Sequence, residues 1–144
     1  MKKSLFFLFL SCLLSGCTYL LESKEDIRGV YVPARAPNKI TFLKITPDFR
    51  AVGCAGVNRF FGPIKIDQAK KTITFGMLAT TMMMGPKKDM EYEQKFLAAA
   101  KRVGKYTLEK DTLTLYDAKG NGILTLYRVA KEKKEESKDV LIFF

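Results

Sequence analysis

The sequence predicts an α+β domain in which a strongly curved antiparallel sheet or open β-barrel, of about seven to eight strands, packs on one α-helix. Three observations lead to this fold class. Short β-branched and aromatic segments recur between turns rich in Gly, Pro, Asn and Asp. One segment, residues 89–103, has helical periodicity. The strands follow one another closely, and strands that are neighbours in sequence usually pair in space.

The first predicted strands lie in the N-terminal third of the chain. Residues 30–32 form a short β-prone run, and residues 40–45 are rich in β-branched and aromatic side chains. A turn is expected at residues 46–48, where a proline presets the backbone angle and an aspartate follows it. Residues 49–54 are therefore expected to pair with residues 40–45 as a hairpin.

The middle of the chain contains two more predicted strands and one ambiguous segment. Residues 64–66 and 73–75 alternate apolar with polar side chains, which is the pattern of half-buried strands. Residues 77–86 contain four methionines and follow neither a strand nor a helix pattern.

The predicted helix covers residues 89–103. Asp89 is expected to cap its first N–H groups, and Gly104 is expected to end it. The charged face is acidic early and basic late, and it includes Glu91 and Glu93. The apolar face is expected to hold Met90, Phe96, Leu97, Ala100 and Val103.

Three strands close the domain. They are expected at residues 106–109, 112–116 and 123–129, and two turn-forming connections, residues 110–111 and 117–122, join them. This order predicts a meander after the helix.

The start of the chain resembles the export signal of a bacterial lipoprotein. Lys2 and Lys3 precede an apolar run at residues 5–14, which is too short to span a bilayer. Small residues then lead into Cys17, the position that lipoprotein processing would acylate. The alternative is an ordinary signal peptide. Thr18, where an Asp would signal retention at the inner membrane, favours an outer-membrane anchor facing the periplasm.

This interpretation divides the chain into four parts. Residues 1–16 are the signal peptide, residues 17–27 the lipidated N-terminus and tether, and residues 28–129 the domain. Residues 130–144 form a charged tail that ends in five apolar residues. These five residues are expected either to pack on the domain or to contact a membrane or partner.

Composition narrows the chemistry. The formal charge of +10 provides solubility or attraction to anionic lipid, but no dense Lys/Arg stripe indicates nucleic acid. The chain has no His, which argues against zinc sites and His-dependent nucleophiles. We therefore expect no enzyme activity, no cofactor and no metal. After removal of the signal and acylation of Cys17, Cys54 remains alone, either as a buried apolar residue or as a reactive thiol.

Two motifs and the helix resemble the META domain family, whose members include the heat-shock lipoprotein HslJ. Residues 56–62, Gly-Val-Asn-Arg-Phe-Phe-Gly, are similar to its Gly-Cys-Asn-Arg-x-x-Gly pattern. Residues 78–86, Leu-Ala-Thr-Thr-Met-Met-Met-Gly-Pro, are similar to Leu-Ala-Thr-Thr-x-Met-x-Cys-Pro, and residues 90–96 continue the match. The resemblance covers about residues 28–129 and implies a small, partly open barrel with a helix.

The family motif is expected to act in the structure of the domain. Its residues are Gly56, Asn58, Arg59, Gly62, Ala79, Thr80, Thr81, Pro86, Met90, Glu91, Glu93 and Phe96. Gly56 and Gly62 suit unusual backbone angles, and Asn58 suits a left-handed turn or a local side-chain cap. The two motif cysteines of the family, which the resemblance implies form a disulfide, are replaced here by Val57 and Gly85.

The resemblance implies links to envelope stress, motility and virulence without an agreed molecular activity. One hypothesis is a non-catalytic lipoprotein that binds an envelope protein or a lipid. An apolar cleft for such a ligand is expected at Met82, Met84, Phe96 and Leu97, unless a filled core occupies this place. The alternatives are a structural, stress-buffering lipoprotein and a hydrolase using Glu91 and Glu93, which lie two apart on a helix and do not face each other.

Overall fold

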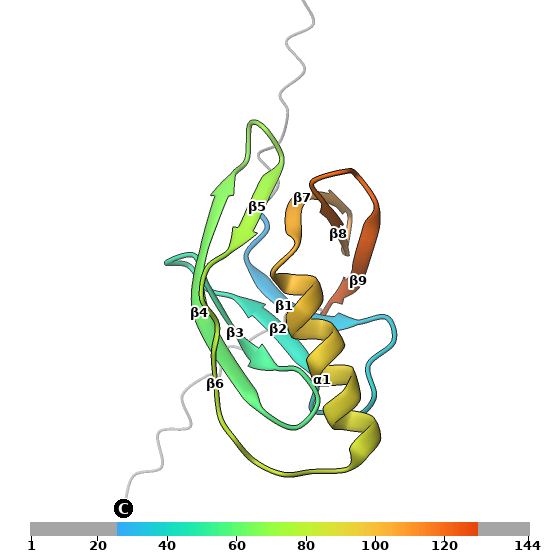
Figure 1. Ribbon diagram of the computed structural model, residues 1–144. Coiled ribbons are helices and arrows are strands. Elements are labelled where there is room, and N and C mark those ends of the chain that lie inside the picture. Colours follow the sequence, from blue (N-terminus) through green and yellow to red (C-terminus); the bar gives the residue numbers. More distant parts are fainter. Residues whose placement is uncertain (1–25, 130–144) are drawn as a thin grey trace, which may run out of the picture.

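The computed structural model describes residues 26–129, which form nine strands and one helix (Figure 1). In chain order the elements are β1 (Gly29–Pro33), β2 (Phe42–Ile45), β3 (Arg50–Cys54), β4 (Arg59–Asp67), β5 (Thr72–Phe75), β6 (Ala79–Thr80), α1 (Lys87–Ala100), β7 (Val103–Glu109), β8 (Thr112–Asp117) and β9 (Gly122–Arg128). The predicted class, a β-barrel with one helix, is confirmed in this range.

The barrel is closed, whereas the sequence predicted a strongly curved sheet or an open barrel. Eight antiparallel strands follow one another in the order β3, β2, β1, β9, β8, β7, β5 and β4, and pairing of β4 with β3 completes the ring. β6 adds to β4 as a ninth strand. The narrowest junction is between β5 and β7, where Thr72 lies opposite Lys105 and the Tyr106 N–H donates to the Lys71 carbonyl. Closure of the barrel could not be predicted from local sequence patterns, because this short contact joins segments that are far apart in the chain.

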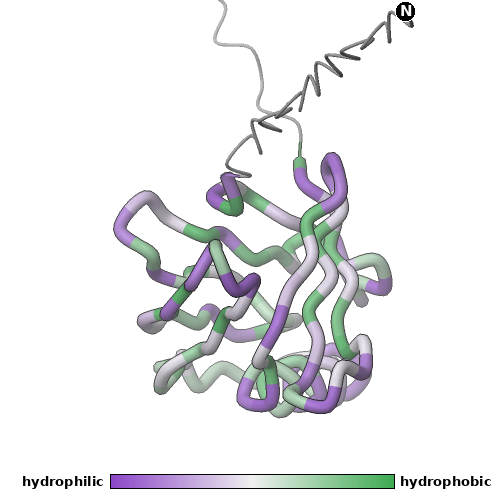
Figure 2. Tube along the Cα trace, turned by 90° about the horizontal axis from the view of Figure 1, so that it is seen from above, coloured by the Kyte–Doolittle hydropathy of each residue, from purple (hydrophilic) through white to green (hydrophobic). Residues whose placement is uncertain are grey.

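Side chains alternate between the two faces of the wall. Along β4, Phe60, Gly62 and Ile64 are buried, while Arg59 and Phe61 are exposed. Figure 2 shows hydrophobic and hydrophilic positions interleaved along the chain. This period of two is what allows one wall to face both the core and water.

β4 is longer than the sequence predicted, and β6 was missed. Gly62 was expected to have an unusual backbone angle, but it lies inside β4 and is not among the glycines with positive φ. A Cβ at Gly62 would come 2.5 Å from the Met77 carbonyl oxygen, so the glycine permits close approach of the segment that leads to β6. The ambiguous Met-rich stretch therefore contributes β6 to the sheet.

The helix begins and ends earlier than predicted. α1 covers Lys87–Ala100, with Pro86 at the N-cap position and no side-chain cap hydrogen bond. Asp89 lies in the first turn instead of capping it. Gly104 does not end the helix, because it lies in β7 next to a register shift between Val103 and Lys105.

The core of the described part lies inside the barrel and under α1. Its largest fully buried side chains include Tyr31, Phe60 and Tyr106. Phe96 of α1 packs on Phe60 with ring centroids 5.5 Å apart. Ile27, which the sequence placed in the tether, is fully buried in this core, so the domain already includes it.

Candidate functional site

The polar residues of the two motif segments meet at a buried carboxylate. Glu93 of α1 is only 9% exposed, although the helical pattern placed it on the charged face. Its Oε2 accepts hydrogen bonds from the backbone N–H groups of Val57 (3.1 Å) and Asn58 (2.6 Å). Its Oε1 accepts a third from Asn58 Nδ2 at 2.9 Å. Burial of this charge is tolerated because three donors converge on it.

Asn58 extends this cluster to the second motif. Its Oδ1 accepts from the Thr81 hydroxyl (2.9 Å) and from the Met83 N–H (2.6 Å), while its Nδ2 also donates to the Met83 carbonyl at 3.2 Å. Thr81 in turn accepts from the Arg59 N–H at 3.1 Å. The Asn58 amide thus bridges two segments and α1, which differs from the local cap that the sequence predicted.

A second polar contact fixes the start of α1 and was missed in the sequence. Asn38 donates from Nδ2 to the Gly56 carbonyl and to Asp89 Oδ2, both at 2.9 Å. Its Oδ1 accepts from the Ile40 N–H and the Thr41 hydroxyl. Gly56 has φ of +145°, and a Cβ there would meet the Asp89 carbonyl oxygen at 2.5 Å.

The other motif residues lie around these contacts. Ala79 and Thr80 form β6, and the Pro86 carbonyl accepts from the N–H groups of Asp89 and Met90. Glu91 is exposed, with an oxygen 3.9 Å from Lys87 Nζ. The arrangement gives the buried carboxylate a structural task, because its oxygens already accept three hydrogen bonds.

The four residues expected to line an apolar cleft do not come together. Phe96 is 3% exposed in the core, whereas Met82 and Met84 are 98% and 88% exposed. Leu97 lines a depression of about 440 Å³ with residues 75–78, Thr80 and Lys101. The expected cleft is therefore corrected: the inner side is filled core, and the methionines point to solvent.

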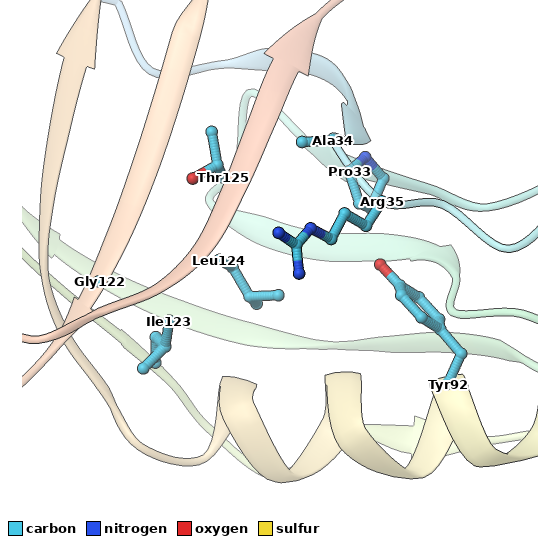
Figure 3. A pocket seen from close by; sticks show the side chains of 8 residues that line it. All are labelled: Pro33, Ala34, Arg35, Tyr92, Gly122, Ile123, Leu124 and Thr125. Carbon is cyan, nitrogen blue, oxygen red and sulfur yellow. The ribbon is translucent and has the colours of Figure 1, made fainter.

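A different cavity lies between α1 and β9 (Figure 3). It has a volume of about 390 Å³ and is lined by Pro33 at the end of β1, residues 34–35 of the β1–β2 loop, Tyr92 of α1 and residues 122–125 of β9. Figure 3 shows the Arg35 and Tyr92 side chains directed into it. We call this cavity the α1–β9 groove.

Among residues 26–129, no strand pairs with the edge that the groove exposes. β1 pairs with β9 only at residues 126–128, and the Ala34 N–H donates to the Thr125 carbonyl just beyond. Gly122 and Leu124 pair with β8 alone, and Ile123 lies between them at a register shift. A free edge beside a helix is the geometry that accepts an extended peptide as an added strand.

The charged and buried side chains around the groove indicate which ligand groups it can contact. A neighbouring cavity of about 360 Å³ shares Arg35 and Tyr92 with it and adds Lys88, Glu91 and Lys95 of α1. In the lining of this neighbouring cavity, three basic side chains thus stand against one acidic side chain. Burial raises the pKa of the Tyr92 hydroxyl, so this group stays protonated and available as a donor at neutral pH.

The cysteines fall into two groups. Cys17 lies outside the described residues. Cys54 is 5% exposed, which confirms the buried alternative and argues against a reactive thiol. Val57 and Gly85, the positions of the family's motif cysteines, are in contact: a Cβ at Gly85 would lie 2.5 Å from Val57 Cγ2.

Two further findings concern residues 26–129 as a whole. No three His, Cys, Asp or Glu side chains there form a group that could hold a metal ion. The helix of this range falls short of the length and apolarity needed to cross a membrane.

Comparison with known proteins gives one family and a fold. The family model of the META domain matches residues 14–130. No curated protein matches the chain. A protein from Burkholderia xenovorans, solved by NMR, is 19% identical with a TM-score of 0.55, over 72% of this chain and 79% of that one. A second NMR structure is 21% identical with a TM-score of 0.54, over 70% of this chain and 89% of that one. These structures support the fold alone.

Proposed function

The chain belongs to the META domain family, and from that premise we propose that it is a non-catalytic lipoprotein of the bacterial envelope. Lipid on Cys17 anchors it to the outer membrane, facing the periplasm. There it binds an envelope protein or a lipid through the α1–β9 groove and supports envelope stress tolerance or virulence. Two or more acyl chains hold a protein firmly on a bilayer, since each buried CH₂ contributes about 0.8 kcal/mol.

The observation that carries binding is the free edge of β9 inside a groove. Residues 122–124 offer backbone hydrogen-bonding groups, while Arg35 and Tyr92 supply polar contacts and the Leu124 side chain an apolar one. Few polar groups in a partly apolar concavity are typical of binding sites. The groove therefore suits a ligand recognised by main-chain pairing and one or two side chains.

Catalysis by carboxylates has little support in this arrangement. Glu93 accepts three hydrogen bonds in the core, and Glu91 lies on the exposed side of the same helix, paired with Lys87. A general base needs to reach a substrate proton, and Glu93 is enclosed. The proposal is thus binding without chemistry.

Two experiments test the two halves of the proposal. Metabolic labelling with palmitate should mark the chain, and Cys17→Ser should abolish the label; labelling that survives Cys17→Ser would refute the anchor. For binding, a photo-crosslinking p-benzoylphenylalanine replaces Tyr92 in the groove or, as a control, Tyr127, which is 52% exposed on β9 and does not line the groove. We expect discrete adducts from position 92 and none from the control position. Binding would be refuted if the two positions gave equal adducts or no adducts and native mass spectrometry also found no bound lipid.

A further inference from the structure

Charge is unevenly distributed over the barrel wall. Positions 27–66, which include β1 to β4 apart from the end of β4, contain seven Lys or Arg residues and one acidic residue, Asp48. The remaining elements mix both signs. This stretch of the chain is therefore predominantly basic, and a field of one sign attracts the opposite charge.

The same stretch presents apolar side chains to solvent. Strand register places Val30, Lys44, Val52, Phe61 and Ala79 in one row across five strands. In this row Val52 is 36% and Phe61 is 53% exposed. These are outward positions, since their neighbours Ala51, Phe60 and Gly62 are buried. An exposed aromatic ring in the middle of a sheet face loses the hydrophobic contribution that burial would provide.

Phe49 extends this apolar patch at the β2–β3 turn. It is 40% exposed and has φ of +56°, a conformation that is uncommon for a bulky residue. Its carbonyl accepts from the Ile64 N–H, which places it beside β4. We call Phe49, Val52 and Phe61, with the basic residues around them, the β3–β4 face.

Four basic side chains surround these apolar ones. Lys44, Arg50, Arg59 and Lys65 are all exposed, and none forms a salt bridge within residues 26–129. Asp48 is the one carboxylate among residues 27–66, and it lies in the turn, where a hydrogen bond from Thr46 and the charge of Arg50 lower its pKa. The basic side chains thus keep most of their charge available to a partner.

We propose that the β3–β4 face docks on an anionic lipid bilayer. Aromatic and aliphatic side chains that insert at the headgroup level, with Lys and Arg around them, are the combination that binds such surfaces. The inference rests on the proposed function only in that the Cys17 anchor brings a membrane near.

The position of the tether is compatible with this docking. Gly29 lies opposite Ile45, so the described chain begins at the same end of the barrel as the β2–β3 turn that carries Phe49. Nine residue steps separate Cys17 from Asp26, and an extended chain covers about 30 Å in that distance. The anchor and the face can therefore reach one bilayer together.

The chain contains no Trp, so one introduced indole reports on one position. The full-length lipidated chain carrying Phe61→Trp is reconstituted into vesicles of phosphatidylcholine with phosphatidylglycerol, or of phosphatidylcholine alone. The matched control is Tyr127→Trp, which is 52% exposed on β9, across the ring from β3 and β4. Val52→Trp, in the same row as Phe61, serves if Phe61→Trp does not fold.

We expect a blue shift and quenching by brominated acyl chains for Phe61→Trp in the anionic vesicles, and neither for Tyr127→Trp. Adding Arg50→Gln and Arg59→Gln should lower the docked-to-free ratio on the order of 30-fold, because each basic residue near the surface contributes about fivefold, or about 1 kcal/mol. High salt should act in the same direction.

The outcomes separate this inference from the anchor. A chain that does not float with the vesicles refutes anchoring through Cys17, while the two spectra in the presence of the same vesicles still decide docking. Equal quenching of both indoles, or an unquenched indole at Phe61→Trp, overturns docking and leaves the anchor intact. Quenching that is the same without phosphatidylglycerol overturns the electrostatic part.

Discussion

Reintroducing cysteines at positions 57 and 85 should create a stabilising disulfide. A Cβ at Gly85 would lie 3.2 Å from Val57 Cβ and 2.5 Å from its Cγ2. Disulfides join Cβ atoms about 3.8 Å apart, so a few tenths of an ångström of movement suffice. In the present chain the valine methyl groups occupy the space beside the glycine, and the barrel holds without a crosslink there.

The expected gain follows from the loop that the bond would close. Residues 57–85 make a loop of 29 residues, for which the chain-entropy relation gives about 3.6 kcal/mol at 25 °C. For a domain of this size that corresponds to a rise in the melting temperature of roughly 10–15 °C. Strain in the folded state would reduce the gain.

The assay is thermal unfolding of the Val57→Cys/Gly85→Cys double variant, with and without reductant. Peptide mass mapping identifies the bond and excludes pairing with buried Cys54. The single variant Gly85→Cys is the control, and it should be less stable than the parent because its side chain meets Val57. Failure of the bond to form under mild oxidation, or formation with no rise in melting temperature, would refute the reasoning.

Three further predictions test the core, the wall and the pH response. In chemical denaturation, Glu93→Gln should lower the free energy of unfolding by about 2–3 kcal/mol, because it weakens charge-assisted hydrogen bonds. The control Glu91→Gln changes an exposed side chain and should alter this free energy by about 0.5 kcal/mol or less. Gly62→Ala should cost about 1–3 kcal/mol by its approach to a backbone oxygen, and Gly122→Ala, whose nearest neighbour would be 3.7 Å away, should be tolerated. Burial raises the pKa of Tyr31 above its ordinary value of about 10, so its contribution to stability is complete below that pH and is lost as the pH rises through the folded pKa. Alkaline denaturation should therefore be shallower in Tyr31→Phe, and an unchanged profile would contradict this.

Local pattern was sufficient to predict the class and most strands. Residues 73–75 became part of β5 and residues 112–116 part of β8, because alternation records which side chains face the core. The hairpin across residues 46–48 also formed, with the Phe49 N–H donating to the Thr46 carbonyl. The motif resemblance was confirmed by the family match.

The errors arise where long-range contacts override local pattern. Glu93 lies three residues before Phe96, on the same side of α1, but a carboxylate at such a position is ordinarily assigned to solvent. Its burial depends on donors 35 and 36 residues away in the chain. Gly104 likewise became part of β7 and did not end the helix, because β7 already pairs with β8 from Val103 onward. Only the motif spacing, which places Asn58 and Glu93 together, could have indicated this cluster.

The order of strands in the ring links the two proposed surfaces. β9 lies across the barrel from β3 and β4, with β2 and β1 between them on one side and β8, β7 and β5 on the other. A domain that docks by its β3–β4 face would therefore turn the α1–β9 groove away from the bilayer, toward soluble partners. Crosslinking from position 92 should then persist in Arg50→Gln/Arg59→Gln, because these changes release the face without altering the groove. Loss of the adducts in that variant, with folding and lipidation unchanged, would mean that the partner contacts the basic face itself, and the two surfaces could not serve separate roles.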